Sequence, residues 1–334
     1  MYRSQLQISA GIALLIAAGA LLLRAADASG FLAIVNQREH SVTLFDLRAR
    51  SALATAEVGV NGHEVVIAPD GKFAYVPIYG NSGVGRPGTD GRTIDIIDLD
   101  TRTLAGHIDL GKPVRPHCAK FAPDGLLYVS AELANAVFVV DTVARKVVAE
   151  IPTGQEESHM FVITPDGHRA YTANVSSGTV SVLDLQKRSL LKIIPVAKSV
   201  QRIAISPDGR HVYTHDQDQP RIAVIDTATD KVGGSIALPD TVYSSALTPN
   251  GKLLLANAPS GKIFEIDLAS AKIIATFDVP PSAGELIIAP DGTRAYLSCP
   301  RAGSIQILDL QSGKLTEPIQ LTPGVDGLAW TLAL

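Results

Sequence analysis

The chain has 334 residues, 46% of them hydrophobic and only 5% aromatic, and its formal net charge is −4. No basic stripe runs along the sequence, which excludes the electrostatic footprint of a nucleic-acid-binding protein and disfavours binding to anionic membranes. Two cysteines, Cys118 and Cys299, are too few for a disulfide framework. The class of protein must therefore be inferred from motifs and their spacing.

The first 28 residues have the pattern of an export signal. Arg3 gives a positive start, Ile8 to Leu23 form an apolar run, and Ala26 to Ala28 fit a small-x-small cleavage site. The run is shorter than the roughly 20 residues that a membrane-spanning helix needs. We expect a signal peptide over residues 1–28, cleaved after Ala28, and a periplasmic or secreted mature protein with no membrane segment. The alternative is an uncleaved anchor.

An apolar tetrad that closes on Asp-Leu or Asp-Thr recurs along the rest of the chain. Its seven aspartates are Asp46, Asp98, Asp141, Asp184, Asp226, Asp267 and Asp309. The intervals between them are 52, 43, 43, 42, 41 and 42 residues. A period in the low forties built of short strands is typical of a β-propeller with one blade per repeat. The aspartates themselves are predicted to accept backbone N–H groups in a turn.

A Pro-Asp-Gly or Pro-Asn-Gly turn precedes six of these motifs. The turns begin at Pro69, Pro123, Pro165, Pro207, Pro249 and Pro290. Proline presets the first central torsion, and glycine supplies the positive φ that the return strand requires. A short apolar run comes before each turn, and a run such as AYVP or LYVS follows it. Each repeat therefore predicts four antiparallel strands, A to D.

The two ends of the chain predict how the ring closes. The sequence after the signal begins at strand B, FLAIVNQ, whereas DGLAWTLAL from Asp326 resembles a strand A with no turn after it. We expect this last strand to pair with the first, so that residues 29–334 form a single all-β domain, a seven-bladed β-propeller. The predicted blades are 31–60 with 325–334, then 61–112, 113–155, 156–198, 199–240, 241–280 and 281–324.

The repeat resembles the YVTN family of seven-bladed propellers, which are exported proteins of bacteria and archaea. It is more distantly similar to haem d1 propeller domains and to propeller lactonases. The resemblance covers essentially all of residues 29–334, and it implies the fold much more than an activity, because this architecture hosts many unrelated functions.

The start of strand A lies at the channel mouth in such a fold, on the face shared by the D-to-A and B-to-C connections. Three consecutive repeats carry histidine there: the register holds His63, His117, His159, Gln201, Tyr243 and Gly284, with Asp326 equivalent in the closing blade. Further polar residues assigned to this face are Glu64, Arg115, Glu157, Arg202, Glu285, His40, Glu132 and His215.

Imidazoles that converge with a carboxylate are the ligand set of zinc or copper. His63, His117 and His159 are therefore candidate ligands for a zinc or copper ion at the channel mouth. The alternative is that each histidine hydrogen-bonds a group in the next blade and fixes the D-to-A loop.

The largest departure from the repeat is an insertion between strands B and C of the second blade, Tyr79 to Ile94. Its Gly83-x-Gly85-x-x-Gly88 matches a dinucleotide fingerprint, but a strand follows where a helix N-terminus would be needed. A glycine-rich loop on the channel face is better interpreted as a lid or contact arm, with Tyr79, Arg86 and Arg92 within reach of an anionic ligand. The alternative is a tolerated surface insertion.

The leading functional hypothesis is a propeller, non-catalytic or weakly catalytic, that binds a small ligand or an extracytoplasmic protein at the channel mouth. We expect a monomer with the ligand-binding residues His63, His117, His159, Tyr243, Asp326, Arg115, Arg202, Glu157, Glu64, Tyr79, Arg86 and His215. One alternative is a metal- or histidine-dependent hydrolase, lyase or isomerase, similar to a lactonase, that acts on a small anionic or sugar-derived substrate. Another is an accessory protein of periplasmic electron transfer.

Overall fold

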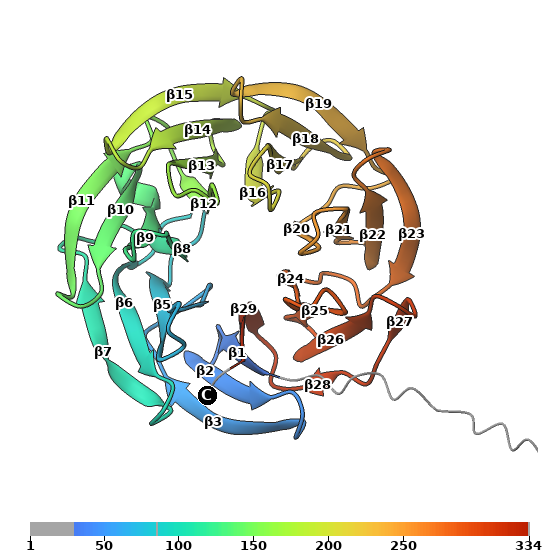
Figure 1. Ribbon diagram of the computed structural model, residues 1–334. Helices are drawn as coiled ribbons and strands as arrows, with labels where there is room; N and C mark the ends of the chain where they lie inside the picture. The colour runs from blue at the N-terminus through green and yellow to red at the C-terminus, as the bar shows by residue number, and fades with distance from the viewer. Residues whose placement is uncertain (1–29, 85, 333–334) are drawn as a thin grey trace, which may run out of the picture.

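The computed structural model describes residues 30–84 and 86–332, which form seven antiparallel sheets arranged as the blades of a ring (Figure 1). This confirms the predicted seven-bladed β-propeller with four strands in each blade. The predicted signal peptide lies outside the described residues. Within the described part, no helix has the length and apolar character needed to cross a membrane.

Blades are numbered here in chain order. Blade 1 contains β29 (Val325–Thr331), β1 (Phe31–Asn36), β2 (Ser41–Asp46) and β3 (Ser51–Glu57). Blade 2 contains β4 (Val66–Ile67), β5 (Phe73–Gly80), β6 (Asp90–Asp98) and β7 (Thr103–Asp109). Blade 3 contains β8 (Pro116–Phe121), β9 (Leu127–Ala131), β10 (Ala136–Asp141) and β11 (Lys146–Pro152), with a short 3₁₀ turn η1 (Glu132–Ala134). Blade 4 contains β12 (Ser158–Ile163), β13 (Arg169–Asn174), β14 (Thr179–Asp184) and β15 (Ser189–Pro195).

The remaining three blades complete the circle. Blade 5 contains β16 (Val200–Ile205), β17 (His211–Asp216), β18 (Arg221–Asp226) and β19 (Lys231–Ala237). Blade 6 contains β20 (Ser244–Leu247), β21 (Leu253–Ala258), β22 (Lys262–Asp267) and β23 (Lys272–Asp278). Blade 7 contains β24 (Leu286–Ile288), β25 (Arg294–Cys299) and β26 (Ser304–Asp309), and its outer strand is divided into β27 (Lys314–Leu315) and β28 (Ile319–Gln320).

The ring closes through strands from the two ends of the chain. β29 pairs antiparallel with β1, with Leu32 opposite Trp330 and Ile34 opposite Leu328. Because β29 is the innermost strand of blade 1, the sheet order is β29-β1-β2-β3, as the sequence predicts. Because the ring is closed, every blade packs against a neighbour on each side, and no blade has the exposed face that an open array would have.

Local turn chemistry explains why the repeat folds in this way. Asp46 Oδ1 accepts N–H bonds from Arg48 and Ala49 at 2.8 Å each, and Asp141 Oδ1 does the same for Val143 and Ala144 at 2.9 and 2.8 Å. The repeated aspartates are therefore turn residues, as predicted, and none of the seven needs a catalytic explanation. Between the blades, apolar faces meet in a series of clusters such as Tyr75, Ile94 and Phe138 between blades 2 and 3.

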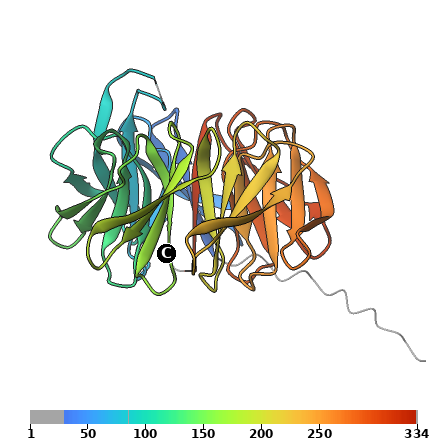
Figure 2. The same ribbon diagram turned by 90° about the horizontal axis from the view of Figure 1, so that it is seen from above.

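The insertion extends the hairpin of β5 and β6, so that it rises beyond one face of the ring (Figure 2). An isolated bridge joins Gly83 and Arg86 near its tip. Gly80 adopts φ +89°, and a Cβ at Gly91 would lie 1.7 Å from the carbonyl oxygen of Ile78. These two glycines let the two sides of the extended hairpin approach each other.

Candidate functional site

The three predicted histidines lie side by side at the channel mouth. The ring centroids of His63 and His117 are 5.1 Å apart, and those of His117 and His159 are 3.8 Å apart. The Tyr79 ring meets both His63 and His117 edge-on, at 5.0 and 5.4 Å. The structure therefore gathers one imidazole from each of three consecutive blades into a single row, and Tyr79 covers it from the insertion.

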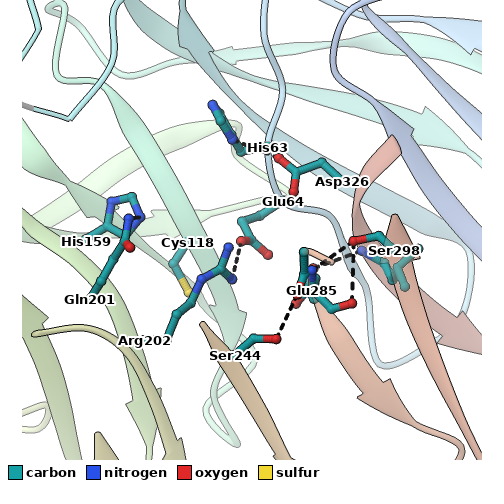
Figure 3. Close-up of polar contacts among 12 residues, drawn as sticks. His63, Glu64, Cys118, His159, Gln201, Arg202, Ser244, Glu285, Ser298 and Asp326 are labelled. Carbon is teal, nitrogen blue, oxygen red and sulfur yellow. Dashed lines mark hydrogen bonds and ion pairs between the residues drawn. The ribbon is translucent and has the colours of Figure 1, made fainter. Parts of the chain in front are cut away.

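His63, at one end of the row, contacts a carboxylate and an amide. Its Nδ1 lies 2.9 Å from Oδ2 of Asp326, and the Gln37 amide nitrogen lies 2.8 Å from its Nε2 and 2.9 Å from its Nδ1. Since a carboxylate can only accept, the partners assign the proton to Nδ1 and leave Nε2 to accept from Gln37. Strand β29 of the closing blade thus orients the first imidazole (Figure 3).

His159, at the other end, repeats the same arrangement. Its Nδ1 hydrogen-bonds Oε1 of Glu132, and its Nε2 lies 3.2 Å from the Gln201 amide nitrogen. Glu132 is only 1% exposed and also accepts a 2.6 Å hydrogen bond from the Tyr79 hydroxyl. Burial and the Glu132 carboxylate raise the pKa of Tyr79, so its hydroxyl remains protonated and donates.

His117, in the centre, has no such support. It is 3% exposed, and its buried Nδ1 has no hydrogen-bond partner among the described residues. Burial, followed by the neighbouring His159, His63 and Arg202, lowers the pKa of His117 well below its usual value. The middle of the row is therefore a neutral imidazole with unused hydrogen-bonding capacity.

An ion pair spans the channel beneath the histidines. Arg202 of blade 5 donates to Oε1 of Glu64 of blade 2 at 3.0 Å, and both side chains are almost fully buried (Figure 3). Its Nη2 also lies 3.1 Å from the Tyr243 hydroxyl, with the guanidinium 4.9 Å from the centre of that ring. The Arg202 Nε has no partner among the described residues.

Two further titratable side chains face this ion pair. Glu285 accepts the Leu328 N–H at 3.0 Å, and burial together with the Glu64 carboxylate raises its pKa well above the usual value. Lys120 is exposed, yet it interacts electrostatically with Glu285, Glu64 and Arg202, which belong to three other blades. A solvent-accessible side chain surrounded by these blades must project into the central channel.

The structure gives Arg115 a supporting position. Its Nε donates to Asp90 Oδ1 at 2.9 Å, and its Nη1 donates to the Gly83 carbonyl oxygen at 3.0 Å. The guanidinium also lies 5.7 Å from the centre of the Tyr79 ring. Arg115 thus fastens the insertion to blade 3 and holds Tyr79 over the histidine row, whereas Arg86 is exposed on the hairpin.

Two residues assigned to the same site lie apart from the row. Glu157, with φ +54°, accepts a 2.7 Å hydrogen bond from Ser176. His215 belongs to β17 and is fully buried between blades 5 and 6, with Nε2 2.8 Å from Ser245 Oγ. Conversely, the role of Gln37 and the channel position of Lys120 were missed by sequence reasoning. Lys120 follows His117 by three residues on β8, and only the ring geometry shows that it points inward.

A carboxylate on Nδ1 is the usual outer partner of a metal-ligating histidine. His63 and His159 both have one, which fits the donor set of zinc or copper, although amides now contact their Nε2 atoms. Over the part of the chain that the structure describes, no group of three or more His, Cys, Asp or Glu side chains is placed so that it could hold a metal ion.

The chain is a seven-bladed β-propeller with polar side chains gathered at its channel mouth, and solved structures are similar to it in fold. No protein-family model and no curated protein matches the chain. Kuenenia stuttgartiensis hydrazine synthase is similar with 21% identity and a TM-score of 0.68, over 89% of this chain and 94% of that one. A functionally unknown protein from Desulfotomaculum acetoxidans DSM 771 is similar with 13% identity and a TM-score of 0.77, over 91% of this chain and 100% of that one.

The dihydro-haem d1 dehydrogenase NirN, in complex with DHE, is similar with 15% identity and a TM-score of 0.67, over 90% of this chain and 75% of that one. These likenesses bear out the resemblance to haem d1 propellers at the level of the fold. The YVTN repeat family stays an interpretation of the sequence motif.

Proposed function

We propose that this propeller binds a small anionic or sugar-derived molecule over the histidine row at the channel mouth. The observation that supports the proposal best is the buried, unpartnered Nδ1 of His117 at the centre of the row. Leaving a buried polar atom unpaired costs about 1–3 kcal/mol, which a ligand or a ligand-induced rotation of the ring would recover.

The surrounding groups suit such a ligand. The outer imidazoles are oriented by Asp326 and Glu132, so the row presents rings in fixed orientations at the channel mouth. Below it, Arg202 is already paired with Glu64, and Lys120 supplies a positive charge that would attract a carboxylate or phosphate group more strongly there than in bulk water.

Thermal-shift and calorimetric titrations with gluconate, δ-gluconolactone and glucose test this function. We expect gluconate or the lactone to raise the melting temperature of the native chain and to lose this effect in His117→Phe, which keeps the ring volume but cannot hydrogen-bond. His168→Phe is the matched control, since His168 is exposed in a turn on the other face. Equal responses in both variants, or none in the native chain, would contradict the proposal.

A second candidate function is metal binding by His63, His117 and His159, because the two outer rings carry carboxylate partners on Nδ1. When bound, zinc or copper would supply Lewis-acid chemistry suited to a hydrolase, lyase or isomerase. We expect elemental analysis to find stoichiometric zinc or copper in the native protein and none in His63→Ala/His117→Ala. His107→Ala/His168→Ala is the control. Metal-free native protein whose melting is unchanged in chelator would exclude this function.

We further propose export to the periplasm or medium and a monomeric mature chain. N-terminal sequencing of the mature protein should begin at Ser29, and light scattering should give the mass of one chain. A retained Met1 would indicate an anchor instead. The likeness to NirN and hydrazine synthase supports the fold alone, so electron transfer gains no support from it.

A further inference from the structure

A large cleft lies far from the histidine row, between blades 5 and 6. It has a volume of about 1010 Å³ and is open to solvent on one side. The ends of β16, β18, β20 and β22 and the turns after them line it, together with the middle of the outer strand β19. None of its lining residues belongs to the channel mouth, so it is a separate site.

Two consecutive glycines in β19, Gly233 and Gly234, make this space. The outer strands share a bulge at this point, and the residues equivalent to Gly233 are Leu53, Ala105, Val148, Leu191 and Ile274. Neither glycine has a positive φ, so the backbone does not require glycine here. A Cβ at Gly234 would meet nothing within 4 Å, and one at Gly233 nothing closer than 3.9 Å.

The neighbouring seam between blades 4 and 5 fills part of the equivalent space with side chains. There Arg169 Nη1 lies 3.1 Å from Asp230 Oδ2 and donates to the Thr227 carbonyl oxygen at 3.0 Å. The Tyr171 hydroxyl donates to Asp230 Oδ1 at 2.7 Å. One cation, one carboxylate and one hydroxyl therefore fill part of that seam, where a smaller cavity of about 400 Å³ remains.

The seam between blades 5 and 6 lacks this arrangement. His211 pairs with Asp226 in the sheet as Arg169 pairs with Asp184, and Tyr213 is the equivalent of Tyr171. Ala271 stands where Asp230 stands, since each precedes the first residue of an outer strand and has positive φ. Consequently the Tyr213 hydroxyl has no hydrogen-bond partner among the described residues, and it lines the cleft.

The cleft is acidic at its rim and apolar beneath. Asp208, Asp226 and Asp267 face one lysine, Lys252. Hydrogen bonds from their own turns lower the pKa of all three aspartates, so they remain ionised. Asp226 accepts its turn hydrogen bonds from Thr229 through Oδ1 alone, whereas Asp208 Oδ2 lies 3.9 Å from Arg210 Nε. The floor includes Tyr213, Val224, Ile236 and Leu268.

We propose that this cleft is a binding site for an organic cation, an amine or amidine with an apolar or aromatic body. The cationic head takes the place that the Arg169 guanidinium occupies in the adjacent seam, next to the Leu268 backbone carbonyl, the Tyr213 hydroxyl and the aspartates. The apolar body fills the space over Gly233 and Gly234, in a cavity large enough for a drug-sized molecule.

Calorimetric titration of the whole chain with benzamidine tests the site, with the isosteric benzamide and benzoate as neutral and anionic probes. We expect saturable binding of benzamidine, at least tenfold weaker binding of benzamide, and none of benzoate. Gly233→Leu, which copies Leu53 and Leu191, should fold with an unchanged or higher melting temperature because its side chain enters open space. It should weaken benzamidine binding at least tenfold.

A second variant keeps the test independent of that one substitution. His211→Arg/Ala271→Asp builds the Arg169–Asp230 arrangement into this seam and should also abolish benzamidine binding, whereas His117→Phe at the channel mouth should leave it unchanged. The proposal is overturned if benzamidine binds the folded Gly233→Leu variant as tightly as the native chain, if benzoate binds as well as benzamidine, or if no probe binds.

Discussion

His215 lies in the seam between blades 5 and 6 with both ring nitrogens in contact with protein groups. Its Nδ1 is 3.2 Å from the Tyr243 carbonyl oxygen, and its Nε2 is 2.8 Å from Ser245 Oγ. The carbonyl can only accept, so Nδ1 carries the proton and Nε2 accepts from the serine hydroxyl. Burial is the main cause that lowers the pKa of His215 to about 4.

A lowered histidine pKa makes stability depend on pH. Between the ordinary pKa of about 6.5 and the folded pKa of about 4, the unfolded chain binds a proton that the folded chain does not. The free energy of unfolding should therefore fall as the pH falls through this window, by roughly 2 kcal/mol from pH 7 to pH 5. Urea unfolding at the two pH values measures it. His215→Asn should remove the decrease in unfolding free energy that His215 causes between pH 7 and pH 5. His168→Asn, at an exposed position, should leave that decrease unchanged.

The ion pair between Arg202 and Glu64 gives a second prediction at this scale. Both side chains are more than nine-tenths buried, so removal of one partner leaves an uncompensated charge. Glu64→Leu or Arg202→Met alone should lower the free energy of unfolding on the order of 3 kcal/mol. The double variant should lose much less than the sum of the single losses. Strictly additive losses in a double-mutant cycle would show that the two groups do not stabilise each other.

One side chain of blade 3 contacts both sides of the insertion. Arg115 links blade 3 to Asp90 and to the Gly83 carbonyl, and it is only 6% exposed. Arg115→Ala should therefore increase hydrogen exchange over residues 80–90 with little change in melting temperature, because the blades themselves keep their contacts. The control is Arg92→Ala, which removes an exposed ion pair with Asp109 and should leave exchange at the tip unchanged. An unchanged exchange rate in Arg115→Ala would mean that the hairpin is ordered without this anchor.

At the scale of the elements, the repeat made the strands predictable because turn residues recur at fixed offsets. The same register predicted that His63, His117 and His159 would meet. It could not predict their partners. Glu132 and Gln37 come from B-to-C connections, whose side-chain directions depend on local twist, and His215 lies within β17, so its side chain enters a seam and not the channel mouth. Arg115 contacts the insertion, and no repeat predicts an insertion's path.

The whole molecule depends on the strand that joins its two ends. β29 supplies the inner strand of blade 1, and its residues Val325 and Leu328 belong to one apolar cluster with Tyr296 of blade 7. It also places Asp326 against His63 and offers the Leu328 N–H to Glu285. Closure of the ring and construction of the site are therefore performed by the same strand.

Deletion of residues 325–334 should consequently open the ring and also disrupt the site at the channel mouth. Without β29, the inner edge of β1 has unpaired backbone groups and the faces of blades 1 and 7 lose part of their apolar contact, so we expect a large fall in melting temperature and aggregation. Loss of Asp326 should also abolish any ligand response at the channel mouth. Deletion of residues 332–334, which follow β29, is the matched control and should leave melting unchanged. A monomeric, cooperative transition near the native temperature in the longer deletion would show that the other six blades hold the ring by themselves.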